Sequence, residues 1–145
     1  MSAISNSVFD PAREGFLLGE VRWITPTIKV ALVRGYTYNA AHKWVSDVTG
    51  AGGTLHATSS ALANKTGTNG VADADDVVFT TPAANATDHS VLVFQSSAVG
   101  GGADVASSAQ RVIAWIDTAT GLPIQPNGAS ITLAFDAGAN KIFHL

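Results

Sequence analysis

Short runs of β-branched and aromatic residues, separated by glycine, proline, asparagine and aspartate, recur along most of this 145-residue chain. Such runs are typical of β-strands, because branched and aromatic side chains pack well on a pleated surface and the residues between them favour turns. The pattern therefore predicts a mainly β protein. The predicted strands are 21–24, 27–33, 54–57, 77–80, 90–94, 111–116, 131–135 and 141–144.

The spacing within and between these runs bears on the architecture. Ile28, Val30 and Leu32 alternate with other residues, so we expect one face of that strand to be buried. Asn-Gly pairs at 69–70 and 127–128 favour hairpins and corners, and no amphipathic run of helix length separates the later strands. We therefore predict an antiparallel β-sandwich of jelly-roll type, with an open barrel as the alternative.

One short helix is predicted near the N-terminus. Asp10 can cap the helix, Pro11 fits its first turn, and Gly19 can end it. The length of the chain is close to that of one domain. We therefore expect an N-terminal arm and short helix over 1–20, followed by a single β domain over 21–145.

Few residues are charged: 13% of the chain, with a net charge of -3. Lysine and arginine are scattered singly, which argues against direct contact with nucleic acid. Neither a signal-like N-terminus nor a run of about 20 apolar residues is present, so we expect an aqueous protein without a membrane partner. Free domains usually carry about 25% charge. The sparse charge favours a subunit packed against neighbours, with a weakly charged monomer as the alternative.

The residues that usually carry chemistry form no familiar constellation. Cysteine is absent, and His42, His56, His89 and His144 lack metal-ligand spacing. The triplet 100–102 is glycine-rich but lacks the Lys and Ser/Thr of a phosphate-binding loop. We predict no catalytic, cofactor-binding or metal-binding residues, and hence no enzyme.

Asp73, Asp75 and Asp76 form the densest acidic cluster. Three carboxylates could hold a hard cation such as calcium, but their spacing is not that of an EF-hand. A solvated acidic turn before the next strand is the favoured interpretation, and cation binding stays open.

The three tryptophans allow another function. Trp23, Trp44 and Trp115 could form a sugar-stacking platform in a glycan-binding module, although the apolar residues on both sides of Trp115 favour its burial. The segment 38–48 around Trp44 fits either a second short helix or a loop that carries a buried aromatic residue.

Three segments are candidates for contacts with other subunits. Phe16, Leu17 and Leu18 give the helix an apolar end, and Ile142, Phe143 and Leu145 give the C-terminal segment the same character. The third candidate is Gly100, Gly101 and Gly102, within 95–109. That segment and 58–70 consist mostly of small residues, so we expect them to stay mobile unless a partner orders them. The alternatives are core packing for the apolar segments and a solvated loop for the glycines.

Several stretches resemble small virion structural proteins of tailed bacteriophages. These are DPAREGFLLG at 10–19, IKVALV at 28–33, NGVADADD at 69–76, IDTATGLP at 116–123, PNG at 126–128 and FDAGANKIF at 135–143. The resemblance runs nearly end to end, and it is to chains found beside major capsid proteins.

Within that group the chain is similar to cement or decoration proteins. The resemblance implies a homodimer or homotrimer that binds the outside of the major capsid protein shell and stabilises it, at the capsid surface of the virion. A tail or neck structural subunit is the nearest alternative. No functional residues come over with the family, because a cement protein works by contact area, about 800 Å² per copy for a durable contact.

Overall fold

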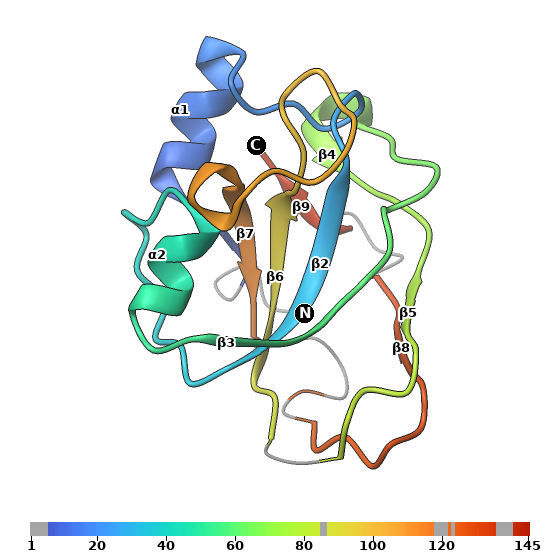
Figure 1. The fold of residues 1–145 in the computed structure, drawn as a ribbon. Helices are drawn as coiled ribbons and strands as arrows, with labels where there is room; N and C mark the ends of the chain where they lie inside the picture. The colour runs from blue at the N-terminus through green and yellow to red at the C-terminus, as the bar shows by residue number, and fades with distance from the viewer. Residues whose placement is uncertain (1–5, 85–86, 118–121, 123, 136–140) are drawn as a thin grey trace.

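The computed structural model describes residues 6–84, 87–117, 122, 124–135 and 141–145 of the chain (Figure 1). An antiparallel sheet of five strands in the order β1-β7-β6-β2-β3 forms its centre. The strands are β1 (Asn6–Val8), β2 (Ile28–Arg34), β3 (Thr54–Thr58), β6 (Ser90–Gln95) and β7 (Arg111–Ile116). The prediction of a mainly β, antiparallel protein is confirmed.

Two antiparallel ribbons of two strands accompany this sheet. β4 (Val71–Ala72) pairs with β9 (Phe143–His144), and β5 (Val77–Phe79) pairs with β8 (Ile131–Leu133). Figure 1 shows β5 and β8 on one side of the view and the two helices on the other.

The helices are α1 (Asp10–Leu18) and α2 (Val45–Gly50), and single 3-10 turns lie at Thr68–Gly70 and Ser107–Ala109. The predicted N-terminal helix is present, but the prediction that Asp10 caps it is wrong: Phe9 is the N-cap, and Asp10 is the first helical residue and pairs with Arg13. α2 begins inside the segment around Trp44. Within the described residues, no helix has the length and apolar character needed to cross a lipid bilayer.

The central strands are buried on both faces. Every residue of β6 and β7 is buried, and in β2 Ala31 and Val33 are buried as well as the alternating set Ile28, Val30 and Leu32. The buried face expected for Ile28, Val30 and Leu32 is therefore confirmed, and Ala31 and Val33 show that the opposite face of β2 is largely buried as well. One core cluster joins residues from the predicted arm to those of the β domain; residues 1–5 of the arm lie outside the described residues.

The predicted strand 21–24 is wrong. Val21 and Trp23 are buried while Arg22 and Ile24 are exposed, so the alternation is real. However, this segment joins no sheet, and the Arg22 backbone N–H donates to the side chain of Gln95 rather than to a neighbouring strand. The alternation indicates which side chains are buried. Side chains can be buried in this way without the backbone hydrogen bonds of a β-sheet.

A β-bulge in the edge strand β3 positions His56. Leu32 pairs with Ala57 and Val33 pairs with Leu55, so His56 is the extra residue of the bulge. Bulges redirect side chains. The His56 Nδ1 atom lies 2.6 Å from a carboxylate oxygen of Asp88.

Asp88 lies at the centre of a buried ion cluster. Its side chain is fully buried, and its second oxygen accepts a hydrogen bond of 3.0 Å from Arg34 Nε. The side chain of His56 is only 7% exposed. A buried carboxylate is tolerated only when it is paired in this way. The cluster ties β2, β3 and the segment before β6 together.

Asp47 caps the N-terminus of α2. One of its carboxylate oxygens accepts hydrogen bonds of 2.9 Å from the backbone N–H groups of both Lys43 and Trp44. Burial alone would raise the pKa of Asp47, but these backbone donors outweigh it and hold the pKa below its ordinary value.

We expect Asp47→Ala to lower the free energy of unfolding by about 1 kcal/mol at neutral pH, because two backbone donors lose their acceptor. A lowered folded-state pKa stabilises the fold above the unfolded-state pKa, and this contribution is lost as the pH falls through the folded value. Urea unfolding at neutral pH and at about pH 3 measures the difference, which should shrink in acid. Asp47→Asn is the control because it keeps an acceptor oxygen. Equal losses for Asp47→Ala at both pH values would contradict this account.

Candidate docking surface

The acidic cluster does not converge on one point. Asp73 lies 3.6 Å from Lys141 Nζ, Asp75 accepts a hydrogen bond from Asn64, and Asp76 accepts one from the backbone N–H of Phe135. Among the described residues, no three His, Asp or Glu side chains are grouped so that they could hold a metal ion. The arrangement supports an acidic turn.

The four histidines lie in separate environments. His42 Nδ1 is 2.7 Å from the Tyr36 hydroxyl, His56 belongs to the Asp88 cluster, and His89 and His144 are exposed. The absence of enzymatic activity stays a prediction.

The tryptophans offer little open ring surface. Trp23 and Trp115 are buried, and Trp44 is half-buried. Lys43 Nζ lies 4.9 Å from the Trp44 ring centroid, and the Arg111 guanidinium carbon lies 5.3 Å from it. Sugar stacking needs exposed aromatic faces, so this arrangement does not favour the glycan-binding alternative.

A large apolar surface is exposed at the C-terminal end of α1. We call it the apolar face, and it consists of Phe16, Leu17, Leu18, Ile24 and Leu145. Leu17 is 88% exposed, Leu18 62%, Ile24 57% and Leu145 60%, while Phe16 is half-buried. Single exposed leucines are ordinary, but four exposed large apolar side chains make this end of α1 a candidate interaction site.

Two hollows lie side by side in the apolar face. The first, about 390 Å³, is lined mainly by apolar side chains, with Arg22 on its wall. The second, about 200 Å³, is lined by Arg13, Phe16, Leu17 and Leu145. Phe16 and Leu145 line both hollows, so the two hollows adjoin.

The end of α1 explains why its leucines face outward. Gly19 has a φ of 76°, and the backbone N–H groups of Glu20 and Val21 both donate to the Gly15 carbonyl oxygen. This left-handed cap reverses the chain. The reversal returns Val21 to the core and leaves Leu17 at the outer side of the turn.

Arg111 fastens α1 to the sheet. Its guanidinium donates hydrogen bonds of 2.7 Å to the Pro11 carbonyl oxygen and to the Glu20 carboxylate. The hydrogen bond from Arg111 lowers the pKa of Glu20. Gly15 lies against this guanidinium, with room for no side chain. The apolar face is therefore presented on a helix held in one position.

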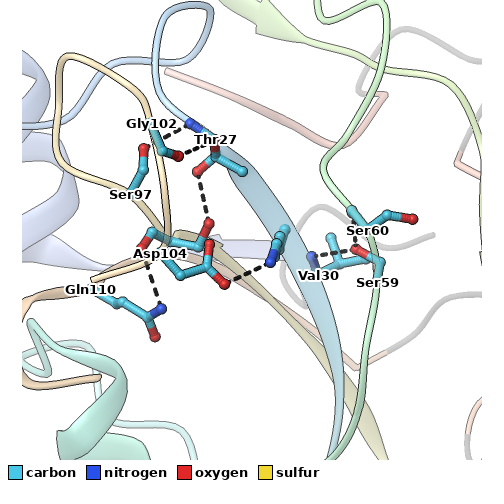
Figure 2. Close-up of polar contacts among 10 residues, drawn as sticks. Thr27, Val30, Ser59, Ser60, Ser97, Gly102, Asp104 and Gln110 are labelled. Carbon is cyan, nitrogen blue, oxygen red and sulfur yellow. Dashed lines mark hydrogen bonds and ion pairs between the residues drawn. The ribbon is translucent and has the colours of Figure 1, made fainter. Parts of the chain in front are cut away.

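The loop with Gly100, Gly101 and Gly102 is held by its own chain. Thr27 donates from its backbone to Ser97 Oγ (2.9 Å) and from its hydroxyl to the Gly102 carbonyl oxygen (3.1 Å), as Figure 2 shows. The structure therefore does not support the expectation that this loop stays loose until a partner orders it.

An ion pair and a second set of serine bonds reinforce the same region. Lys29 Nζ pairs with Asp104 at 2.6 Å, and Ser59 Oγ accepts from the Val30 backbone and donates to the Ser60 carbonyl oxygen (Figure 2). The Lys29 hydrogen bond lowers the pKa of Asp104. Both small-residue segments are thus attached to β2.

The predicted contact segments gather at one end of the molecule. A Cβ atom on Gly101 would lie 3.1 Å from the Thr25 carbonyl oxygen, and Thr25 and Ile24 line the first hollow. Figure 1 shows α1, the C-terminus and this loop together at the top of the view. We call this region the docking end: the apolar face together with Thr25 and the glycine loop.

Two predicted contact residues lie in the core instead. Ile142 is 0% exposed and Phe143 3%, so Ile142 presents no surface to a partner and Phe143 only borders the first hollow. The core alternative therefore describes these two positions. Ile24 is not identified as a contact residue from the sequence, because the pattern in 21–24 predicts a strand. The alternation of Ile24 with Trp23 is the signal that indicates its exposure.

Comparisons with protein-family models, with curated proteins and with solved structures find no match to this chain. The docking end therefore has to be interpreted from its own geometry.

Proposed function

We propose that this protein is a cement or decoration protein of a tailed bacteriophage, which binds the outside of the major capsid protein shell and braces it. The observation that carries the proposal is the docking end, where exposed aliphatic side chains adjoin a loop of small residues. The resemblance of the sequence to phage virion proteins is the reason for proposing a phage capsid as the partner.

The sparse charge of the chain supports the same conclusion. With 13% charged residues, most of the surface is made of uncharged side chains, which lose little hydration when neighbouring subunits cover them. A capsid repeats the same contact many times. Modest contacts then sum to a durable attachment by avidity.

We also retain the jelly-roll-like sandwich as a proposal. The burial of both faces of β6 and β7 supports a sandwich. The described sheet ends at β1 on one side and β3 on the other, so it is not closed, and an open barrel stays the alternative. A homodimer or homotrimer of such a sandwich domain is compact enough to bind the surface of a capsid shell.

A tail or neck subunit is the second candidate. It would use the same docking end, so the location of the protein in the particle distinguishes the two functions. Glycan binding is less favoured, because Trp23 and Trp115 are buried and two cationic side chains lie against the half-buried Trp44 ring.

Deleting the protein from phage particles tests the proposal. Heads without it should lose infectivity faster on heating or osmotic shock, and adding purified protein should restore the resistance. Val78→Lys, which changes an exposed aliphatic residue of β5 outside the docking end, should restore it as well. Leu17→Lys should restore it less. Stable heads with defective tails would contradict the proposal and favour the tail or neck subunit.

A further inference from the structure

We infer that a second copy of this chain covers the apolar face, in a two-fold symmetric dimer that seats Leu17 of each copy in the first hollow of the other. The inference rests on the proposed function and divides its docking end: a second copy occupies the apolar face, and the glycine loop remains for the capsid shell. Dimer formation itself does not require attachment to a capsid.

Shape is the first argument. Leu17 is the most exposed large apolar residue of the described chain, and it lines the second hollow, next to the first. A two-fold axis near Phe16 and Leu145, which line both hollows, places the second hollow of one copy over the first hollow of the other. A projection beside a hollow on one face is self-complementary, as a two-fold interface requires.

Charge is the second argument. Glu14 and Arg22 are exposed, and neither forms an ion pair within the described part of the chain. Glu14 precedes Leu17 by one helical turn on α1, and Arg22 lines the first hollow. Seating Leu17 in that hollow therefore brings Glu14 beside Arg22 of the second copy. Arg13, which also lines the second hollow, is paired with Asp10 of its own chain, and symmetry repeats the Glu14–Arg22 pair on both sides of the contact.

Sedimentation of the purified chain is the first test. We expect a dimer at about 100 µM, and Leu17→Lys should weaken association at least about 100-fold, because it places two charges in the apolar contact. Lysine suits the C-terminal end of a helix, so the variant should stay folded, which circular dichroism checks. Val78→Lys is the matched control and should dimerise like the unchanged chain.

A charge exchange tests the orientation. Glu14→Arg and Arg22→Glu should each weaken the dimer by up to about tenfold, because two rim pairs become repulsive. The combination Glu14→Arg with Arg22→Glu should restore it. A double variant as weak as the single ones would overturn the arrangement.

The absence of cysteine permits a direct test of the contact. A Leu17→Cys chain mixed with an Ile24→Cys chain should form a cross-linked heterodimer under mild oxidation, because both positions border the first hollow in the dimer. A Val78→Cys chain mixed with Ile24→Cys should not.

The outcomes separate the two proposals. A chain that stays monomeric at about 100 µM, or that forms a trimer, overturns the two-fold dimer. If such a chain still restores heat resistance to deleted particles, the cement function stands and the dimer fails. A dimer with the expected cross-link that does not attach to capsids supports the dimer and contradicts the cement function.

Discussion

Asp88→Ala should lower the free energy of unfolding by about 3 to 5 kcal/mol, because it removes the buried carboxylate that both Arg34 and His56 contact. The Arg34 side chain is 17% exposed and that of His56 7%, so water reaches neither group freely. His56 would also lose the acceptor 2.6 Å from its Nδ1 atom. Urea unfolding at neutral pH measures the effect.

Asp10→Ala is the matched control for this prediction. Asp10 also pairs with an arginine, Arg13, at 3.2 Å, but both side chains are more than half exposed. Exposed pairs of this kind contribute about 1 kcal/mol or less. Similar losses in the free energy of unfolding for the two variants would show that burial does not make the Asp88 cluster more stabilising than an exposed ion pair.

Gly15→Ala should destabilise the protein by about 1 to 3 kcal/mol through overpacking, although alanine is the better helix former. A Cβ atom at this position would lie 2.5 Å from a methyl carbon of Val21 and 2.6 Å from Arg111 Nη2. The guanidinium cannot move aside without losing its bonds to Pro11 and Glu20. Either those bonds break or α1 moves away from β7, and thermal unfolding detects both.

Gly50→Ala provides the comparison, since it places the same change in α2. No atom outside the helix backbone and the chain neighbours lies within 4 Å of the added Cβ atom, so this variant should be neutral or stabilised by up to about 1 kcal/mol. Because α1 carries the apolar face, Gly15→Ala should also weaken self-association. A Gly15→Ala protein as stable as Gly50→Ala would contradict the close packing of α1.

The strands that could be predicted are those whose buried positions are apolar in the sequence. β6 and β7 are apolar on both faces, so a run of apolar residues identified them. β1 and β4 are three and two residues long, too short to leave a pattern. The bulge at His56 depends on the pairing register between β2 and β3, which no local sequence specifies.

The docking end was predicted only in part. The apolar end of α1 is visible in the sequence because three large residues follow one another after Gly15. The first hollow forms where Phe16 of α1, Trp23 and Phe143 meet, and the Trp23 and Phe143 ring centroids lie 5.2 Å apart. Contacts between such distant positions arise from tertiary packing. The same holds for the cluster of Arg34, His56 and Asp88.

The bulge in β3 has a consequence for proteins crowded at high local concentration. An exposed strand edge invites further strands to add, which leads to fibrils and precipitates. The extra residue at His56 interrupts the regular spacing of backbone donors and acceptors along that edge, so an incoming strand finds no continuous template. The bulge thereby disfavours the addition of further strands to the sheet. It does not hinder an association through side chains at α1.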